Sequence, residues 1–384
     1  MKKLKNTLKD MDKVLLICTV ILFVFGLLNI VTASSQVAVL KYNTSLYNYF
    51  FKQAAILIGS VIISIYIIMK PTRNYRVFGL VLFIVVGILN VAVLFIGQNW
   101  SGNQNWIDFG FFNLQPSELA KPTMIIFLSV LFEAFYFRLR NPNKDHNSML
   151  AIILFAGLFF PLMVFLQKDM GTMIILCVIF FVMFFASPIL KSDKLKVLFL
   201  VLILGVVGIF IIFVNAGKLF SEKQLNRFNF FDPCSRYESG GYQICNGFIA
   251  INSGGLFGVG IGNSTQKSYI PEAHTDSVFA IIAEEYGFIF SSVILILYII
   301  VLYRILKISS TSKTIRGRYI AFGMSIYIFC HIFINLGGLF GIIPLTGVPL
   351  PFLSYGGSFT LSLFCSLAVI QRIHIENKNQ KIKV

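Results

Sequence analysis

Apolar runs of about 20 residues recur along the whole of this chain, from Val14 to Ile370. A helix of that length crosses the hydrocarbon core of a bilayer. The chain of 384 residues is 57% hydrophobic and only 12% charged, so one soluble domain cannot hide all its apolar side chains. The sequence therefore predicts an all-α polytopic membrane protein with no soluble domain left over.

The apolar runs divide into about ten predicted membrane-spanning helices. These are residues 14–33, 48–69, 76–96, 117–137, 149–166, 170–188, 196–215, 276–303, 317–341 and 355–373. The first run is similar to the apolar part of a signal peptide, but it is too long and no A-x-A cleavage site follows it. We therefore expect it to be retained as a span, within a single integral membrane domain that covers residues 1–384.

The net charge of +16 raises the question of nucleic-acid binding, which the positions of the basic residues answer. Most of the 32 Lys and Arg residues fall in segments that are cytoplasmic if the N-terminus is inside, as the positive-inside rule predicts. They include Lys2, Lys3, Lys5, Lys9, Lys13, Lys70, Arg73, Arg76, Arg138, Arg140, Lys144, Lys191, Lys194, Lys196, Arg304, Lys307, Lys313, Arg316, Arg318, Arg372, Lys378, Lys381 and Lys383. This charge orients the helices and meets anionic lipid. We expect both termini in the cytoplasm and no nucleic-acid partner.

Three stretches of irregular backbone fall on the outer side in this topology. The longest is the large extracytoplasmic loop at residues 216–275, whose many apolar side chains favour packing on the membrane or on the helices. The other two, residues 100–116 and 343–358, carry helix breakers at membrane depth. Such breakers survive only when they are buried in protein or line a wet cavity. We expect the three stretches to wall a cavity that opens outward.

Two of the six cysteines, Cys234 and Cys245, share the long outer loop. A disulfide between them would close a short loop and stabilise it by about 3 kcal/mol in the entropic description. Two free thiols fit the sequence as well. The other four cysteines fall in predicted spans.

Asp276 begins the eighth predicted span, at the end of the stretch Pro271–Asp276. A carboxylate in this position can cap the free N–H groups of the first helical turn. The same position at the membrane surface is wet enough for a sugar hydroxyl to enter, which suits a general base. The spacing of residues does not separate these two roles.

Glu284 and Glu285 lie about two turns deeper in the same span, roughly 12–14 Å along the helix axis. Ionisable groups at such depth are costly and are usually functional. On a continuous helix, Glu284 lies about 80° around from Asp276 and Glu285 about 180°, so both cannot face it. We expect Glu285 to pair with another helix, and Glu284 is open between pairing and function.

Four more charged residues are candidates for binding. Glu118 and Lys121 are spaced i, i+3 at the start of the fourth span and can meet on one helix face. They form either a structural ion pair or part of a cavity that meets substrate. Arg227 and Lys267 are cations of the outer loop, and they are either solvated charges or partners of a phosphate group.

Other patterns carry less chemistry. Asp169 precedes the sixth span and is expected to cap it. The glycine run at residues 258–262 lacks the preceding strand and the Gly-Lys-Ser/Thr of a nucleotide loop, so we expect close backbone packing there instead. His274 and Glu272 are only two residues apart in a loop. No His, Cys or acid cluster has metal-ligand spacing, and we predict no structural metal.

Several motifs, in order along the chain, resemble the SEDS family of peptidoglycan glycosyltransferases. They are Gln115–Lys121, Gln167–Thr172, Asn226–Phe228, Gly241–Gln243, Ser253–Gly258, His274–Asp276 and Ser354–Gly357. Asn263–Lys267 and Pro271–His274 are similar to the division-type members, since elongation-type members more often have arginine where Ala273 stands. Lys168 replaces the usual proline and Ser277 the usual phenylalanine, which puts the local turn and packing in question but keeps both acids.

The resemblance implies polymerisation of lipid II on the outer face of the cytoplasmic membrane. The 4-hydroxyl of one GlcNAc would attack the anomeric carbon of the growing chain's MurNAc and expel undecaprenyl pyrophosphate. The resemblance makes Asp276 essential, and we assign it as the general base. Arg227 and Lys267 become candidates for binding the pyrophosphate. The candidates for substrate binding in the other motifs are Glu118, Lys121, His274 and Ser354.

The resemblance also implies partners. These are lipid II, the growing glycan strand on undecaprenyl pyrophosphate, a class B penicillin-binding protein that crosslinks the strands, and other divisome proteins at the division septum. It names no cofactor with certainty, and a divalent cation, Mg²⁺ or Mn²⁺, is an open option beside the pyrophosphate. Two alternative functions of the protein stay open. A lipid II flippase would need inward access and essential acids deep in the spans, and a scaffold would tolerate Asp276→Asn.

Overall fold

The chain is described here by a computed structural model, which describes residues 7–36, 45, 47–100, 103–110, 113–140, 146–219, 232–235, 237–239 and 241–382. All of the predicted spans appear as helices. They are α2 (Lys13–Gln36), α3 (Asn48–Met69), α4 (Tyr75–Ile96), α5 (Pro116–Ala134), α6 (His146–Leu166), α7 (Met170–Ala186), α8 (Lys191–Leu219), α11 (Val278–Ser310), α12 (Ile315–Leu339) and α13 (Gly357–Ile382). By length and composition, 7 helices among the described residues are able to cross a membrane, and α7 is a shorter apolar helix. The predicted polytopic helical fold is confirmed.

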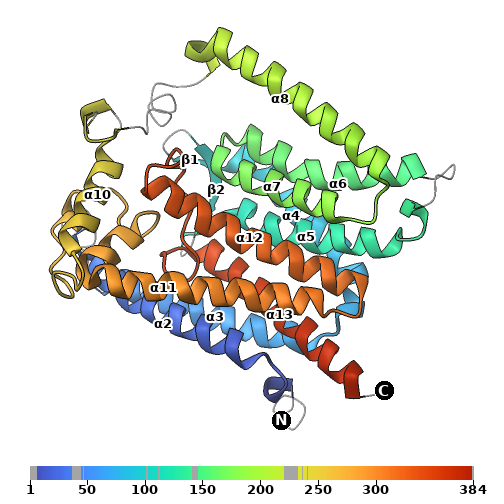
Figure 1. The fold of residues 1–384 in the computed structure, drawn as a ribbon, viewed down its shortest axis with the longest axis horizontal. Helices are drawn as coiled ribbons and strands as arrows, with labels where there is room; N and C mark the ends of the chain where they lie inside the picture. The colour runs from blue at the N-terminus through green and yellow to red at the C-terminus, as the bar shows by residue number, and fades with distance from the viewer. Residues whose placement is uncertain are drawn as a thin grey trace.

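The helices form one bundle, with α8 drawn along its upper edge (Figure 1). Within the bundle α3 packs on α13, α4 on α5, and α11 on both α12 and α2. The outer helices expose large apolar side chains such as Phe51, Phe95 and Val77. That pattern is expected of surfaces that face lipid rather than water.

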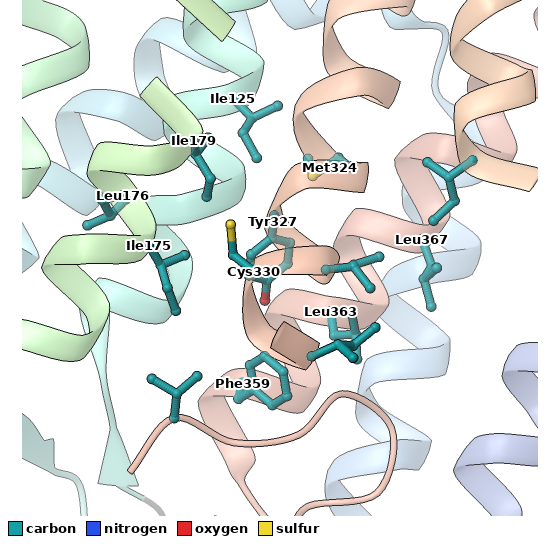
Figure 2. Packing of buried hydrophobic residues seen from close by; sticks show 14 of the residues in the cluster. Ile125, Ile175, Leu176, Ile179, Met324, Tyr327, Cys330, Phe359, Leu363 and Leu367 are labelled. Atoms are coloured by element: carbon teal, nitrogen blue, oxygen red, sulfur yellow. The ribbon is translucent and has the colours of Figure 1, made fainter. Parts of the chain in front are cut away.

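The centre of the bundle is packed around α12. Figure 2 shows its inward side chains between those of α5 and α7 on one side and those of α13 on the other. The labelled residues are Ile125, Ile175, Leu176, Ile179, Met324, Tyr327, Cys330, Phe359, Leu363 and Leu367. Because α12 is enclosed by its neighbours, polar side chains on it are buried and must find partners inside the protein.

Both chain termini lie at one end of the bundle, at the lower right of Figure 1. The main-chain N–H of Asp12 donates to Gln371 Oε1 at 2.8 Å, and Gln371 Nε2 donates back to the carbonyl of Asp12 at 3.1 Å. The turn between α3 and α4 lies at the same end, because Thr72 N donates to Oε1 of Glu376, near the end of α13, at 2.8 Å. We call this the terminal end.

The opposite end carries structure that the sequence did not predict. Among the described residues, three short strands form a small antiparallel sheet there, namely β1 (Gln98–Trp100), β2 (Asn103–Asp108) and β3 (Asn113–Leu114). The long loop contains the helix α10 (Tyr242–Gly254), which packs on α11. Figure 1 places both features away from the two termini.

The start of α11 corrects a prediction. The helix begins at Val278 rather than at residue 276, and it is interrupted at Gly287, whose φ is 77°. The angular positions derived for Glu284 and Glu285 assumed one continuous helix from Asp276, so that calculation was wrong. A left-handed glycine inside an apolar run cannot be distinguished from a helical one by sequence periodicity.

Candidate active site

Asp276 lies in the turn that leads into α11, and it does not cap the helix. The residue before the helix is Ser277, and no side chain caps the first turn. Instead, the Asp276 carboxylate accepts hydrogen bonds at Oδ1 from Gln243 Nε2 of α10 at 3.3 Å and from Thr275 Oγ1 at 3.4 Å. The capping explanation for this acid therefore finds no support in the structure.

Two further elements surround the acid. Asn335 of α12 donates through Nδ2 to the main-chain oxygen of Asp276 at 2.7 Å. Gly347 lies beside the carboxylate, since a Cβ at this glycine would be 3.6 Å from Asp276 Oδ2. Its φ of 72° is left-handed, a conformation that favours glycine. Asp276 is thus held where α10, α12 and the loop before α13 meet, and the residue as a whole is partly exposed.

The surroundings of Asp276 change its acidity. The pKa of this carboxyl is raised to about 6. Burial is the largest cause and the Glu272 carboxylate adds to it, while the hydrogen bonds from Gln243 and Thr275 act in the opposite direction. A carboxyl with such a pKa is mostly ionised at neutral pH yet accepts a proton more readily than an ordinary aspartate. These are the properties that a general base requires.

His274 joins the turn to the loop before α13. Its ring is buried, with its centroid 4.7 Å from that of Tyr49 and 5.6 Å from that of Tyr355. Its main-chain oxygen accepts a hydrogen bond from Tyr355 N at 2.9 Å. The Glu272 carboxylate lies 3.9 Å from Nε2. His274 therefore helps to fix the position of the Asp276 turn.

Glu118 and Lys121 form a buried cluster with His331 of α12. Lys121 Nζ lies 2.7 Å from Glu118 Oε1 and 3.0 Å from His331 Nε2. The expected i, i+3 pair is confirmed, and Lys121 is 0% exposed. Because an ammonium only donates, Nε2 must accept, which places the imidazole proton on Nδ1, 3.1 Å from the carbonyl of Pro349. The cluster thereby holds the loop before α13.

One face of α12 links this cluster to Asp276. His331 and Asn335 are one turn apart on that face. Asn335 Nδ2 donates to the carbonyl of Val348 at 2.8 Å as well as to that of Asp276. The loop before α13 is therefore fixed at both Val348 and Pro349 by residues of α12.

Glu284 holds the loop that precedes the turn. Its carboxylate accepts from Ser264 Oγ, from Thr265 N at 3.0 Å and from Thr265 Oγ1 at 3.0 Å. Glu285 is also buried, and its carboxylate lies near the Thr32 hydroxyl of α2 and the main chain of Gly262. The sequence left the role of Glu284 open, and the structure gives it this structural one.

The break at Gly287 is filled by the glycine run. Main-chain carbonyls of α11 freed at the break accept from Val259 N at 2.9 Å and Gly260 N at 3.1 Å, and Phe288 N donates to Gly255 O at 2.9 Å. Non-helical backbone at membrane depth is therefore hydrogen-bonded within the protein, as the bilayer requires. The expectation of close backbone packing for the glycine run is confirmed.

Asp169 caps α7 as expected. Its Oδ1 accepts from Thr172 N at 3.1 Å, and its Oδ2 accepts from Asn105 at 2.9 Å and from Gln115 at 3.0 Å. The preceding Lys168 has a φ of 63°. Proline is fixed near −65° and cannot adopt this conformation, so the turn as it stands here could not carry a proline at this position.

Three other residues are predicted to bind substrate, and the structure shows no common site for the two that it describes. Lys267 Nζ donates to the carbonyl of Gly262 at 2.6 Å, and we find no direct contact with Asp276 within the described residues. Ser354 is buried, and its hydroxyl accepts from Leu350 N at 2.8 Å. Arg227 lies outside the described residues. Binding of substrate by these three residues stays a prediction.

Cys234 and Cys245 are joined in a disulfide, with their Cα atoms 4.9 Å apart. The bridge settles the alternative that the sequence left open. Cys245 belongs to α10, the helix that carries Gln243. The disulfide therefore tethers the outer loop next to the residue that contacts Asp276.

Within the part of the chain that the structure describes, no group of three or more His, Cys, Asp or Glu side chains is arranged to hold a metal ion. We therefore assign no chemistry to a metal held by this protein alone.

The sequence missed the residues that position Asp276. Gln243 and Gly347 stood within segments that the sequence singled out but had no assigned role, whereas Tyr49, His331 and Asn335 gave no signal. Each comes from a segment far from Asp276 in the chain, so local spacing cannot reveal it.

Comparison with known proteins gives one consistent family. The chain matches the cell cycle protein family of FtsW, RodA and SpoVE over residues 12–379. It is 32% identical over 384 residues to the probable peptidoglycan glycosyltransferase FtsW of Haemophilus ducreyi, which covers 98% of this chain and 92% of that protein. It is 33% identical over 399 residues to the protein of the same name in Bacillus subtilis, which covers 98% of this chain and 95% of that protein.

Two solved structures share the fold. One, described as "Structural coordination of polymerization and crosslinking by a peptidoglycan synthase complex", aligns with a TM-score of 0.74 at 20% identity over 96% of this chain and 98% of that chain. The other is the rod shape determining protein RodA of Thermus thermophilus, with a TM-score of 0.67 at 21% identity over 95% and 96% of the two chains. At such identities the likeness concerns the fold.

Proposed function

The chain belongs to the FtsW, RodA and SpoVE family of cell cycle proteins, and on that basis we propose that it is a membrane glycosyltransferase that polymerises lipid II into peptidoglycan strands. The names of its curated relatives support this activity. We further propose that it works on the outer face of the cytoplasmic membrane during cell division. The two termini would then be cytoplasmic.

The observation that carries the proposal is the setting of Asp276. It is a carboxylate with a pKa of about 6 in a partly exposed residue, at the end of the bundle away from the termini. Three separate elements hold it, through Gln243, Asn335 and the loop at Gly347. A base must be ionised, accessible and rigidly placed, and Asp276 meets all three needs.

In the proposed reaction Asp276 accepts the proton of the GlcNAc 4-hydroxyl of one lipid II molecule as that oxygen attacks the anomeric carbon of the other substrate's MurNAc. The bond from that carbon to the pyrophosphate breaks, and undecaprenyl pyrophosphate leaves. A direct displacement inverts the α-linked donor to a β-1,4 product. Lys267 and Arg227 are proposed to neutralise the leaving pyrophosphate.

The buried cluster of Glu118, Lys121 and His331 has a positioning role in this proposal. It fixes the loop before α13 through Pro349, and that loop forms one wall beside Asp276. None of its three side chains is exposed enough to meet a sugar in this conformation.

We also propose a class B penicillin-binding protein as the membrane partner and the division septum as the site of action, together with other divisome proteins. The fold is similar to a chain from a solved structure that concerns a peptidoglycan synthase complex. The chain itself has no transpeptidase domain in its described residues. The disulfide between Cys234 and Cys245 is consistent with an oxidising outer compartment.

The test is polymerisation of labelled lipid II by the purified protein with its cognate partner. Asp276→Asn, at equal folded amounts, should lower the rate by at least about a hundredfold, since general bases contribute that much or more. Asp108→Asn is the matched control, because Asp108 is an exposed acid at the same end of the bundle, and it should keep the wild-type rate.

If the wild type and Asp276→Asn form strands equally well, Asp276 is not the general base. The proposal that the protein is a polymerase would still stand. If neither makes strands beside a competent partner, the activity itself is refuted. Lipid II movement across vesicle membranes would then identify the protein as a flippase.

A further inference from the structure

An open cavity lies at the terminal end, far from Asp276 in the fold. Its volume is about 900 Å³, and it lies between α3, α4 and α5, with α12 and α13 at the back. It exists because α3 packs on α13 and α4 packs on α5, whereas α3 and α4 make little contact with each other. Its volume is at the upper end of the range for ligand-binding pockets.

The walls of this cavity are apolar. Leu82, Ile126, Met324 and Val369 line its depth. At its edge, apolar side chains such as Val77 are exposed on the outer surface of the bundle. Because this surface faces lipid in a membrane-spanning bundle, the cavity opens to the hydrocarbon region and suits an acyl chain.

The end of the cavity at the α3–α4 turn is basic. Lys70, Arg73 and Arg76 all line it. Arg76 Nη2 pairs with Glu133 at 3.2 Å, but Lys70 and Arg73 have no ion pair among the described residues. Both are exposed at the level where a lipid head group would lie.

The nearby acids do not balance these cations. Glu133 also pairs with Arg316 at 2.9 Å, and Glu376 pairs with Arg372 at 2.9 Å. Of the described residues around the cavity and Tyr75, two carboxylates, Glu133 and Glu376, thus face five cations, namely Lys70, Arg73, Arg76, Arg316 and Arg372. The excess of positive charge favours an anionic group.

A buried hydroxyl gives an independent indication of a ligand. Tyr75 lines the same cavity, is only 4% exposed, and its hydroxyl has no hydrogen-bond partner among the described residues. Leaving such a donor unpaired is costly, and a phosphate oxygen would satisfy it.

We propose that this cavity binds one anionic phospholipid from the leaflet at the terminal end. Its phosphate lies among Lys70, Arg73 and the Tyr75 hydroxyl, and an acyl chain fills the space between α3 and α4. A zwitterionic lipid offers the same chains but no net charge to match the basic end. This site is separate from the proposed glycosyltransferase site, so either proposal can fail without the other.

The test is lipid retention, measured by native mass spectrometry on the full-length protein in detergent with equal amounts of phosphatidylglycerol and phosphatidylcholine of identical chains. The wild type should retain phosphatidylglycerol preferentially. Lys70→Gln with Arg73→Gln should weaken that binding by roughly thirtyfold, the effect of two interfacial charges. The matched control is Arg138→Gln with Arg140→Gln, which removes two exposed cations of another connection on the same side and should bind as the wild type does.

A second variant tests the acyl-chain site. Val81 lines the cavity and is half exposed, so Val81→Trp fills the space and should reduce retention of phosphatidylglycerol as well. Equal retention of both lipids by the wild type would overturn the proposal, and that result needs no variant. Equal losses in the two double variants would also overturn it, because they would indicate attraction to the surface as a whole.

Discussion

At the scale of single residues, Lys121 is the charge whose removal should destabilise the protein most. Lys121→Met leaves the buried Glu118 carboxylate without its partner, which costs about 3–5 kcal/mol in comparable buried pairs. Lys196→Met is the matched control, because Lys196 pairs with Asp193 at the same i, i+3 spacing but is 77% exposed, and surface pairs contribute about 0–1 kcal/mol. Thermal unfolding in detergent measures both.

A similar loss of stability in the two variants would contradict the buried cluster. The double change Glu118→Gln with Lys121→Met gives a further check. It removes both charges, and it should therefore unfold at a higher temperature than Lys121→Met alone.

Gln243 should set the pH range in which Asp276 works. Its hydrogen bond lowers the pKa of Asp276, so Gln243→Leu should raise that pKa further. The ionised fraction then falls at mildly acidic pH, and the acidic limb of the rate profile moves to higher pH. Polymerisation rates of wild type and variant at a series of pH values measure this shift, and an unmoved or acid-shifted limb would argue against it.

The sequence could identify residues of the site only where their position along the chain is itself informative. Glu118 and Lys121 meet because helix geometry brings residues i and i+3 together, and Asp276 stood out because it is an acid at a predicted membrane boundary. His331 and Asn335 lie in an apolar run with no local pattern around them. Their partners at Pro349 and Val348 are set by how α12 packs, which spacing along the chain does not encode.

At the scale of elements, the break in α11 should tolerate no side chain. Gly287 has a φ of 77°, and a Cβ there would lie 2.6 Å from the carbonyl oxygen of Leu256. Gly287→Ala should therefore lower stability by more than the roughly 1 kcal/mol of left-handed strain alone. Gly205→Ala is the control, since that glycine lies in α8 with open space around it and alanine favours a helix.

Melting temperatures of the two alanine variants provide the measurement. Gly205→Ala should match or slightly exceed the wild type. An equally mild effect of Gly287→Ala would mean that α11 is continuous in solution.

The spans were predictable because bilayer thickness imposes one length on every apolar run. The interruption at Gly287 was not, because it depends on main-chain contacts with residues 255–260, some thirty positions earlier. The helix α10 was missed for a related reason. Its 13 residues are short and mixed in polarity, and it is stabilised by packing on α11 rather than by its own sequence.

At the scale of the whole molecule, the terminal end should face the cytoplasm. The basic residues predict this orientation, and the contacts of Asp12 with Gln371 place both termini together. A membrane-impermeant maleimide applied to intact cells should label Asp108→Cys, at the opposite end, but should label Lys378→Cys only after permeabilisation. The unmodified chain gives the background from its native cysteines. The reverse pattern would invert the topology and remove Asp276 from the outer face.

The central claim is that ionised Asp276 is the base that drives polymerisation. The most direct measurement is the rate of lipid II polymerisation by the wild type with its cognate partner from pH 5 to pH 8. Because burial raises the pKa of Asp276 to about 6, the rate should rise tenfold per pH unit below that value and level off above it. A rate that does not change between pH 5 and pH 7, or that falls as the pH rises through 6, would contradict the account.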